Sequence, residues 1–297
     1  MRDNGPILVP LDGSELAEGA LPYAVALAKA LGERIVLMTA WEGTESALGA
    51  NFPALALEVE QKANTYYASY LDGVRARIGA AVSVEAQVKS GDAATEILRA
   101  ADELGARAVV IATHGRSGIG RWLYGSTAGA ILRSSPVPIL AVGPHALQRS
   151  TADVSLQHVL VPLDGSPLSE AALPVASALA AALHGRVTLA RAVGWAVQTY
   201  PYAMPDAYIP QVDEELETGA KTYLRAQEAA VSGVPVDAFV VRGGSADGLL
   251  DVVEKQHIDL VVMTTHARSG LLRAALGSTA DRMLQAPVPV LLVRPPD

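Results

Sequence analysis

The chain has 297 residues, of which 50% are hydrophobic, a formal net charge of -8 and no cysteine. At roughly 150 residues per domain, this length predicts two domains, each with enough apolar residues for a core of its own. The acidic balance argues against a dedicated nucleic-acid binder, and the missing cysteines exclude disulfides, thiol catalysis and thiolate metal sites.

The apolar segments predict neither a leader peptide nor a membrane span. Residues 1–6 lack the apolar core of a signal peptide. The longest apolar stretch, residues 171–183, contains Pro174 and Ser177 and is too short to cross a bilayer. We therefore expect a soluble cytoplasmic protein that makes no contact with membranes.

Strand and helix signals alternate through the first half of the chain. The predicted strands are residues 7–11, 35–41, 82–88, 108–111 and 138–142, and the predicted helices are residues 15–31, 55–78, a segment ending near 104, and 128–132. Pro22 lies inside the first helical pattern, where it should kink the helix, and Gly32 should end that helix. Strands 82–88 and 138–142 have the features of sheet edges. The alternation predicts an α/β fold with helices on both faces of a mostly parallel sheet.

Four residues follow or end predicted strands and should lie near one another. They are Asp12, Ala40, Gly91 and Ala112. In parallel sheets ligands bind beyond the carboxyl ends of the strands, at the point where the strand order reverses. We therefore expect these four residues to converge on one crevice, although they come from separate stretches of the chain.

A glycine-bearing loop follows the strand 108–111 and ends in a turn that opens a helix. The loop begins Thr113-His114-Gly115-Arg116-Ser117-Gly118, and the turn is Gly125-Ser126-Thr127. Free backbone N–H groups and a helix dipole at such a place suit an anion such as phosphate. The alternative is a set of tight turns with Ser126 as a helix cap. One copy of the motif does not decide between the two interpretations.

The whole pattern occurs twice. The separations 164 − 12, 266 − 114 and 277 − 125 are each 152, and 287 − 136 is 151. The chain is therefore a tandem duplication with small insertions and deletions. We expect domains at residues 1–143 and 158–297, joined by a polar, irregular linker at 144–157. The halves differ most at 194–213, an aromatic and proline-rich loop that we interpret as a lid on its own domain, with a partner surface as the alternative.

With both copies in view, the chain resembles the universal stress protein family. The phosphate loop of that family reads Gly, two residues, Gly, nine residues, Gly, then Ser or Thr. The first copy here reads Ala112, Gly115, Gly125, Ser126 at these positions, and the second reads Thr264, Ala267, Gly277, Ser278. The first glycine is missing from both copies, and the second glycine is missing from the second copy.

The resemblance implies a fold and a mode of assembly. The family fold is a doubly wound α/β domain with a five-stranded parallel sheet in the order 3-2-1-4-5, whose last strand pairs across a two-fold axis. It implies that the two halves pair through residues 138–142 and 289–293 as an internal pseudo-dimer, which also covers two exposed sheet edges. Further association into a homodimer, and an unidentified protein partner, stay open.

The resemblance also implies a binding site for ATP or another adenine nucleotide, with magnesium arriving together with the nucleotide. Asp12 would lie near the ribose, Ala40 and Gly91 near the adenine, and Ala112 where a glycine approaches the ribose. The remaining implied positions are Gly115, Arg116, Gly125, Ser126 and Thr127 at the phosphates, and Asp164, Ala192, Gly243, Thr264, Ala267, Gly277, Ser278 and Thr279 in the second half. For Asp12 the alternative is a turn acceptor, and for Arg116, Arg121, Arg268 and Arg273 it is a solvated loop.

Three functions are compatible with this site. The first is an ATP-binding stress-response regulator that acts through nucleotide-dependent conformation or partner binding, the second a slow ATP hydrolase, and the third a scaffold that binds no nucleotide. His114 and His266 have no motif that ties them to a nucleophile, so we expect structural roles for them and no catalytic residue. Because Thr264 and Ala267 add bulk where the first half has Ala112 and Gly115, the second site should bind more weakly or stay empty.

Overall fold

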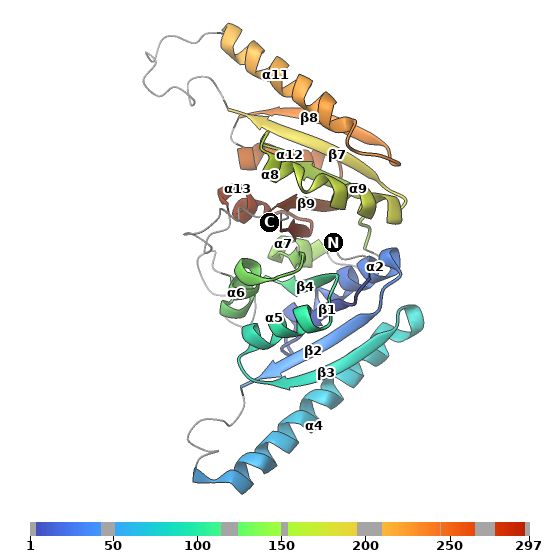
Figure 1. The fold of residues 1–297 in the computed structure, drawn as a ribbon, viewed down its shortest axis with the longest axis vertical. Helices are drawn as coiled ribbons and strands as arrows, with labels where there is room; N and C mark the ends of the chain where they lie inside the picture. Colours follow the sequence, from blue (N-terminus) through green and yellow to red (C-terminus); the bar gives the residue numbers. More distant parts are fainter. Residues whose placement is uncertain are drawn as a thin grey trace. The chain divides into compact units, whose positions relative to one another are not determined.

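The computed structural model describes residues 4–42, 51–113, 124–149, 154–194, 210–243, 245–264 and 277–294. The chain divides into two compact units, Met1–Val154 and Ser155–Asp297. Within each unit, helices pack against parallel β-strands (Figure 1). The predicted α/β fold of two tandem domains is therefore confirmed.

In the first unit, strands and helices alternate along the chain in the predicted order. They are β1 (Ile7–Pro10), α1 (Glu15–Glu18), α2 (Leu21–Leu31), β2 (Ile35–Trp41), α4 (Pro53–Ile78), η1 (Gly79–Ala81), β3 (Val84–Ser90), α5 (Ala93–Glu103), β4 (Ala108–Ala112), α6 (Ser126–Ser134), β5 (Ile139–Val142) and α7 (Pro144–Arg149). The strands lie in the order β3-β2-β1-β4-β5, and each paired neighbour is parallel. This is the predicted order, with the alternating strand β3 at one end.

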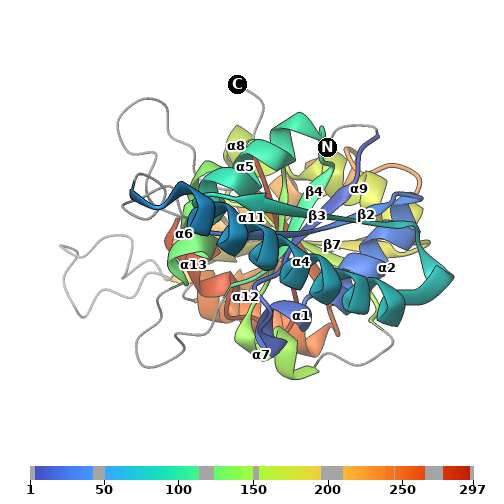
Figure 2. The ribbon, with the colours of Figure 1, turned by 90° about the horizontal axis from the view of Figure 1, so that it is seen from below.

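The burial of each strand explains its place in the sheet. Ile7, Leu8 and Val9 of β1 are fully buried, as expected for a central strand covered on both faces. In Figure 2, α2 and α4 lie on one side of β2 and β3, and α5 lies on the other. Along β3 the side chains are exposed or half-buried, which matches a strand at the margin of a two-sided core.

The predicted helix over residues 15–31 is two helices, which explains Pro22. The chain breaks between α1 and α2 at Gly19 and Ala20, so Pro22 lies in the first turn of α2. A first-turn proline removes no intrahelical hydrogen bond and has a suitable φ, so the predicted kink is wrong. Gly32 ends α2 with φ 67°, which confirms it as the left-handed C-cap. Pro174 has the same first-turn position in α9 (Leu173–Ala182).

The second unit repeats the architecture. Besides α9, its elements are β6 (His158–Pro162), α8 (Pro167–Glu170), β7 (Arg186–Val193), α11 (Pro210–Glu228), β8 (Val236–Arg242), α12 (Ser245–Lys255), β9 (Leu260–Thr264), α13 (Ser278–Met283) and β10 (Val290–Val293). The parallel strand order is β8-β7-β6-β9-β10, which corresponds strand for strand to the first unit.

The segment between the domains differs from the expected irregular linker. Residues 144–149 form the helix α7, whose Ala146 is buried. The Tyr23 hydroxyl of α2 donates a hydrogen bond of 2.8 Å to the Ala146 carbonyl, so α7 is part of the first unit. The pairing of the two final strands as a pseudo-dimer stays a prediction. In the described parts of the chain, no helix combines the length and apolar character that a membrane crossing needs.

Candidate functional site

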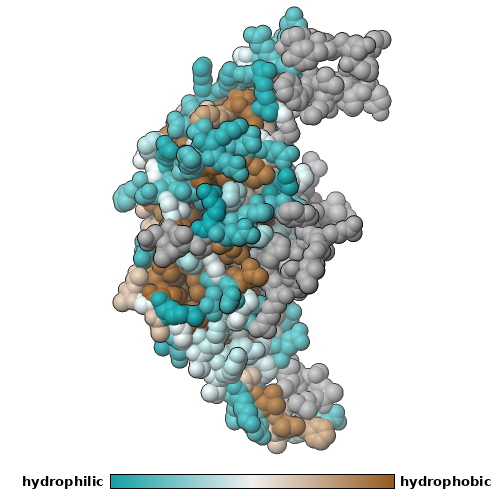
Figure 3. Space-filling model, turned by 180° about the vertical axis from the view of Figure 1, so that it is seen from behind, coloured by the Kyte–Doolittle hydropathy of each residue, from teal (hydrophilic) through white to brown (hydrophobic). Residues whose placement is uncertain are grey.

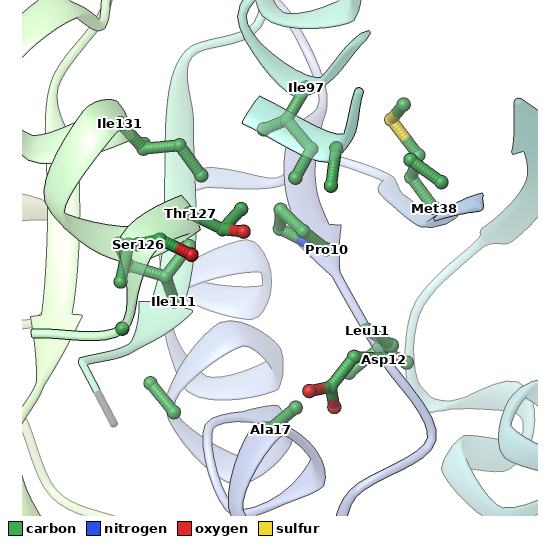
Figure 4. Close-up of a pocket in the computed structure, with 15 residues that line it drawn as sticks. Pro10, Leu11, Asp12, Ala17, Met38, Ile97, Ile111, Ser126, Thr127 and Ile131 are labelled. Carbon is green, nitrogen blue, oxygen red and sulfur yellow. The ribbon is translucent and has the colours of Figure 1, made fainter. Parts of the chain in front are cut away.

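A cavity of about 280 Å³ lies at the carboxyl ends of the strands of the first unit (Figure 4). Its position is the one expected from the strand order, because β1 and β4 are adjacent while their chain connections leave in opposite directions. The described lining residues are Pro10, Leu11, Asp12, Ala17, Met38, Ala40, Ala93, Ile97, Ile111, Ala112, Gly125, Ser126, Thr127, Ala128 and Ile131. Residues from β1, β2, β4, α5 and α6 thus meet in one place.

Asp12 lies two residues after β1, and one of its carboxylate oxygens is hydrogen-bonded within the turn that follows the strand. Its Oδ1 accepts hydrogen bonds from the Ser14 backbone N–H at 2.9 Å and from the Ser14 hydroxyl at 2.6 Å. The Ser14 hydroxyl in turn caps α1 by accepting from the Ala17 N–H. One carboxylate oxygen therefore holds the turn, and Oδ2 is the oxygen that can face a ligand.

The amino end of α6 forms the opposite side of the cavity from Asp12 (Figure 4). Gly125, and not Ser126, is the N-cap, and no side chain caps the helix. Ser126 as the helix cap, which was the alternative interpretation of this turn, is therefore wrong by one position. The Gly125 N–H donates to the Thr113 carbonyl at 3.3 Å, so this amide closes the base of the loop. The first-turn amides of Ser126 and Thr127 have no intrahelical partner and are available to an anion.

The remaining positions implied for the first site fall into two groups. Gly91 directly follows β3 and has φ 137°, but it is not among the described residues that line the cavity. A Cβ at Gly91 would come within 3.1 Å of the Glu96 side chain, so glycine is needed here for the local turn. His114, Gly115, Arg116 and Arg121 lie outside the described residues.

The apolar wall of the cavity was not anticipated. It consists of Met38, Ile97, Ile111 and Ile131, and in Figure 4 Ile97 and Ile131 lie on the side away from Asp12. The sequence places each of them on the inward side of a strand or helix. That pattern is the same for a residue of the hydrophobic core, so it could not identify them as residues of a site. An apolar wall facing a few polar groups is typical of sites for small organic ligands.

A half-buried carboxylate links α1, the helix after the Asp12 turn, to α4. Glu18 of α1 accepts a 2.9 Å hydrogen bond from the Tyr70 hydroxyl of α4 and pairs with Arg77. Burial, followed by the hydrogen bond to Glu18, raises the pKa of Tyr70 well above its usual value, so Tyr70 stays a donor. In the second unit Tyr223 donates to Glu170 at 2.9 Å. Burial is also the main cause that raises the pKa of Tyr223, to about 12.

The second unit has a smaller cavity at the equivalent place, about 90 Å³. Asp164, Ala192, Thr264 and Thr279 are among its described lining residues, together with Pro162, Leu163, Ser166, Leu168, Ser169, Ala190, Leu249 and Met263. Gly243 follows β8, Gly277 is the N-cap of α13 and Ser278 begins that helix, but none of these three is among the described lining residues. Ala267, His266, Arg268 and Arg273 lie outside the described residues, as does the loop 195–209.

Side chains of the second unit explain part of the smaller volume. Thr264 replaces Ala112 and is 6% exposed, and Ser169 replaces Ala17. The Ser169 hydroxyl is hydrogen-bonded within its own turn, because it accepts from the Asp164 N–H and donates to the Ser166 carbonyl. Ala190 replaces Met38 and acts in the opposite direction by leaving space. The helix at the site, α13, has six residues against nine in α6.

The described lining of the first cavity is poor in groups for acid–base or metal chemistry. Asp12 is the one ionisable side chain among the described lining residues. In the described parts of the chain, no three His, Asp or Glu side chains are grouped so as to hold a metal ion. This arrangement can bind a ligand with an apolar ring and a polar, anionic end, and it offers little from its own described side chains for catalysis.

Both units of the chain are similar to known proteins. The profile described as "Universal stress protein family" matches residues 4–143 and 155–294. A universal stress protein of Mycobacterium tuberculosis is 30% identical over 190 residues, which are 64% of this chain and 62% of that protein. One of Mycolicibacterium smegmatis is 30% identical over 219 residues, 72% of this chain and 70% of that protein. The alignment thus spans less than two thirds of the Mycobacterium tuberculosis relative.

Solved structures show the same fold over the full length. A universal stress protein of Archaeoglobus fulgidus superimposes with a TM-score of 0.70 at 20% sequence identity, covering 100% of both chains. A protein described as a putative universal stress protein of Pseudomonas aeruginosa gives a TM-score of 0.59 at 16% identity, over 98% of this chain and 94% of that one.

Proposed function

Because the chain belongs to the universal stress protein family, we propose that its first unit binds an adenine nucleotide, ATP in the first instance, and that occupancy controls the conformation or the partner binding of the protein. The observation that carries this proposal is the cavity of about 280 Å³, which brings Asp12, Ala112 and the amino end of α6 together. Its volume is just below the range of roughly 300–1,000 Å³ for small-molecule sites.

Each part of the cavity matches a part of a nucleotide. The apolar wall of Met38, Ile97, Ile111 and Ile131 suits a base. The Asp12 Oδ2 can accept from a ribose hydroxyl while Oδ1 keeps the turn. The free amides of Ser126 and Thr127, at the positive end of a nine-residue helix, suit phosphate. Magnesium, when present, would be carried by the phosphates.

Binding rather than hydrolysis is the function that the described residues favour. A hydrolase needs a base or another group that positions the attacking water. Asp12 is the ionisable side chain of the described lining, and Ser14 already occupies one of its oxygens. We therefore place a regulatory, nucleotide-dependent role ahead of slow ATP hydrolysis.

The first experiment tests the ligand with variants that preserve the turn. Asp12→Asn keeps an oxygen that can accept from Ser14 but removes the charge from the position of Oδ2. A hydrogen bond to a charged group contributes about 1.5–3 kcal/mol, so the ATP affinity measured by calorimetry should fall about tenfold or more. Asp164→Asn is the matched control in the second unit and should leave the measured affinity unchanged. An Asp12→Asn protein with wild-type affinity would reject the assignment.

A second pair of variants tests the phosphate end. Gly125 and Gly277 are N-caps with φ of -52° and -60°, and aspartate is a favourable N-cap. Gly125→Asp should therefore fold, but its carboxylate takes the amides that a phosphate needs and repels the ligand. We expect it to abolish the tight site, whereas Gly277→Asp should change little. Two sites of equal affinity, or a tight site that responds to Gly277→Asp, would contradict the ranking of the two units.

A further inference from the structure

The N-cap residue of α4 and the first turns of the helix expose large apolar side chains. The exposed fractions are 60% for Phe52, 47% for Leu55, 37% for Val59 and 70% for Tyr66. Figure 3 shows apolar residues gathered at the bottom of the view, over the part of the molecule where α4 begins. Single exposed apolar residues are ordinary, but a contiguous group of them marks an interaction surface.

Three of these residues form one line along the helix, because spacings of four and seven residues place Leu55, Val59 and Tyr66 on the same side of α4. Phe52 is the N-cap residue directly before the helix. We call the four residues the α4 stripe. Lys62 fills the gap in the line between Val59 and Tyr66. It forms an ion pair of 2.6 Å with Glu58, which flanks the line. The apolar line is therefore interrupted by one positive charge, with one negative charge beside it.

The fold does not require the whole stripe, as the duplicated unit indicates. Tyr223 corresponds to Tyr70, since each donates to the equivalent glutamate of α8 or α1. This correspondence pairs Val59 with Val212 of α11 and Tyr66 with the exposed Gly219, and it pairs Lys62 with Glu215. The large aromatic side chain at Tyr66 is thus not needed for this helix to pack.

We propose that the α4 stripe is an interface through which two copies of this chain associate, with the two α4 helices antiparallel. The stripe is self-complementary in charge, which is what a two-fold interface needs. A two-fold axis close to Val59 brings Glu58 opposite Lys62 of the partner subunit and Lys62 opposite the partner subunit's Glu58. The same antiparallel arrangement places the amino end of the stripe, at Phe52, near Tyr66 of the partner subunit.

The size of the stripe predicts a weak association. An aromatic side chain buries about 150–250 Å² when fully covered, so two partly exposed aromatics and two partly exposed aliphatics offer roughly 400 Å² per copy. A pair would bury about 800 Å² in total, below the 1,200–2,000 Å² of stable interfaces. The dimer should therefore form at high protein concentration and dissociate on dilution. The alternative binding partners of the stripe are a membrane surface and an unrelated protein, and the experiments below distinguish them from a second copy.

Crosslinking gives a direct test because the chain has no cysteine. Val59→Cys places one thiol near the proposed axis, and Leu57→Cys places one at a residue that is 56% exposed but turned well away from the stripe. With a short bis-maleimide, we expect Val59→Cys to give crosslinked dimers at least tenfold faster than Leu57→Cys. Equal rates for the two variants would overturn the proposal.

Sedimentation tests the same interface without a new thiol. The wild-type average mass should rise with concentration, and Leu55→Glu should remove the rise because each copy would place a carboxylate in the apolar line. The affinity for ATP should be unchanged, which separates loss of pairing from loss of fold. A wild-type mass that does not vary with concentration would overturn the proposal, and so would a Leu55→Glu protein that still associates. Binding of wild type, but not Leu55→Glu, to vesicles of phosphatidylcholine and phosphatidylglycerol would assign the stripe to membranes instead.

Discussion

Replacing one cavity residue of the first unit by its counterpart from the second unit tests why the two sites should differ in affinity. Ala112 ends β4 and lines the cavity of about 280 Å³, whereas Thr264 ends β9 and lines the cavity of about 90 Å³. Ala112→Thr adds a methyl and a hydroxyl group to the first cavity. These atoms should occupy space that the proposed ribose would otherwise fill.

The magnitude follows from where the added atoms go. Forcing two extra heavy atoms against a well-packed group costs about 1–3 kcal/mol, which corresponds to about a 5- to 150-fold loss of affinity. In the ligand-free protein the same atoms project into the cavity and displace no core side chain. The free energy of unfolding should therefore change by less than about 0.5 kcal/mol.

The assay pairs calorimetric titration with ATP and urea unfolding of the same preparation. Thr264→Ala is the reciprocal variant, and it should strengthen binding to the second unit only in part, because Leu249, Met263 and Ser169 still narrow that cavity. Wild-type affinity in Ala112→Thr would refute the reasoning. So would a loss of stability equal to the loss of binding energy, because it would show damage to the fold rather than occupation of the site.

Two predictions concern stability. Burial, and then the nearby Arg186, lower the pKa of His158, which lies between the Arg186 guanidinium at 3.1 Å and the Thr188 hydroxyl at 2.8 Å, with Asp259 close by. The native state then binds fewer protons than the unfolded state, so the free energy of unfolding should decrease as the pH falls below about 6.5. Urea unfolding measured from pH 7.5 to 5 should show this decrease. The same decrease in His158→Gln would contradict the assignment to His158. His184 has φ 52°, where the first unit has Gly32. His184→Gly should raise the free energy of unfolding by about 0.5–1 kcal/mol. Relief of the left-handed conformation gains about 1–2 kcal/mol, and the greater chain entropy of the unfolded state costs about 0.4–1 kcal/mol. A lower free energy of unfolding, measured with urea, would argue against strain at His184.

The strand order and the meeting of separate segments could be predicted because they depend on general rules. Apolar runs identify buried strands, and the duplication provides each signal twice. Asp12, Ala40 and Ala112 were expected in one crevice and do line one cavity. The topology of a parallel sheet is sufficient for that prediction, since all strand carboxyl ends meet at one edge.

Other features depend on local geometry that the sequence leaves open. Pro22 fits both a kinked helix and a second helix that begins one residue earlier, and the break at Gly19 decides for the latter. Asp12 was expected either to bind ribose or to hold a turn, and the hydrogen bonds to Ser14 show that one oxygen holds the turn. Gly91 was expected beside the base, but a strand end also needs glycine where φ is positive.

The difference between α4 and α11 sets a limit on the size of any assembly. At the described positions that correspond to Val59, Lys62 and Tyr66, α11 carries Val212, Glu215 and Gly219. Because Gly219 stands where the stripe has Tyr66, the described part of α11 lacks the aromatic end of the surface. A chain with one complete self-complementary surface uses it up when two copies meet, so growth stops at a closed pair. Had both units carried the stripe, each chain would have offered two such surfaces, and association could have continued end to end into filaments. Restoring an apolar line on α11, for example with Glu215→Leu and Gly219→Tyr, should therefore change a dimerising protein into one that polymerises.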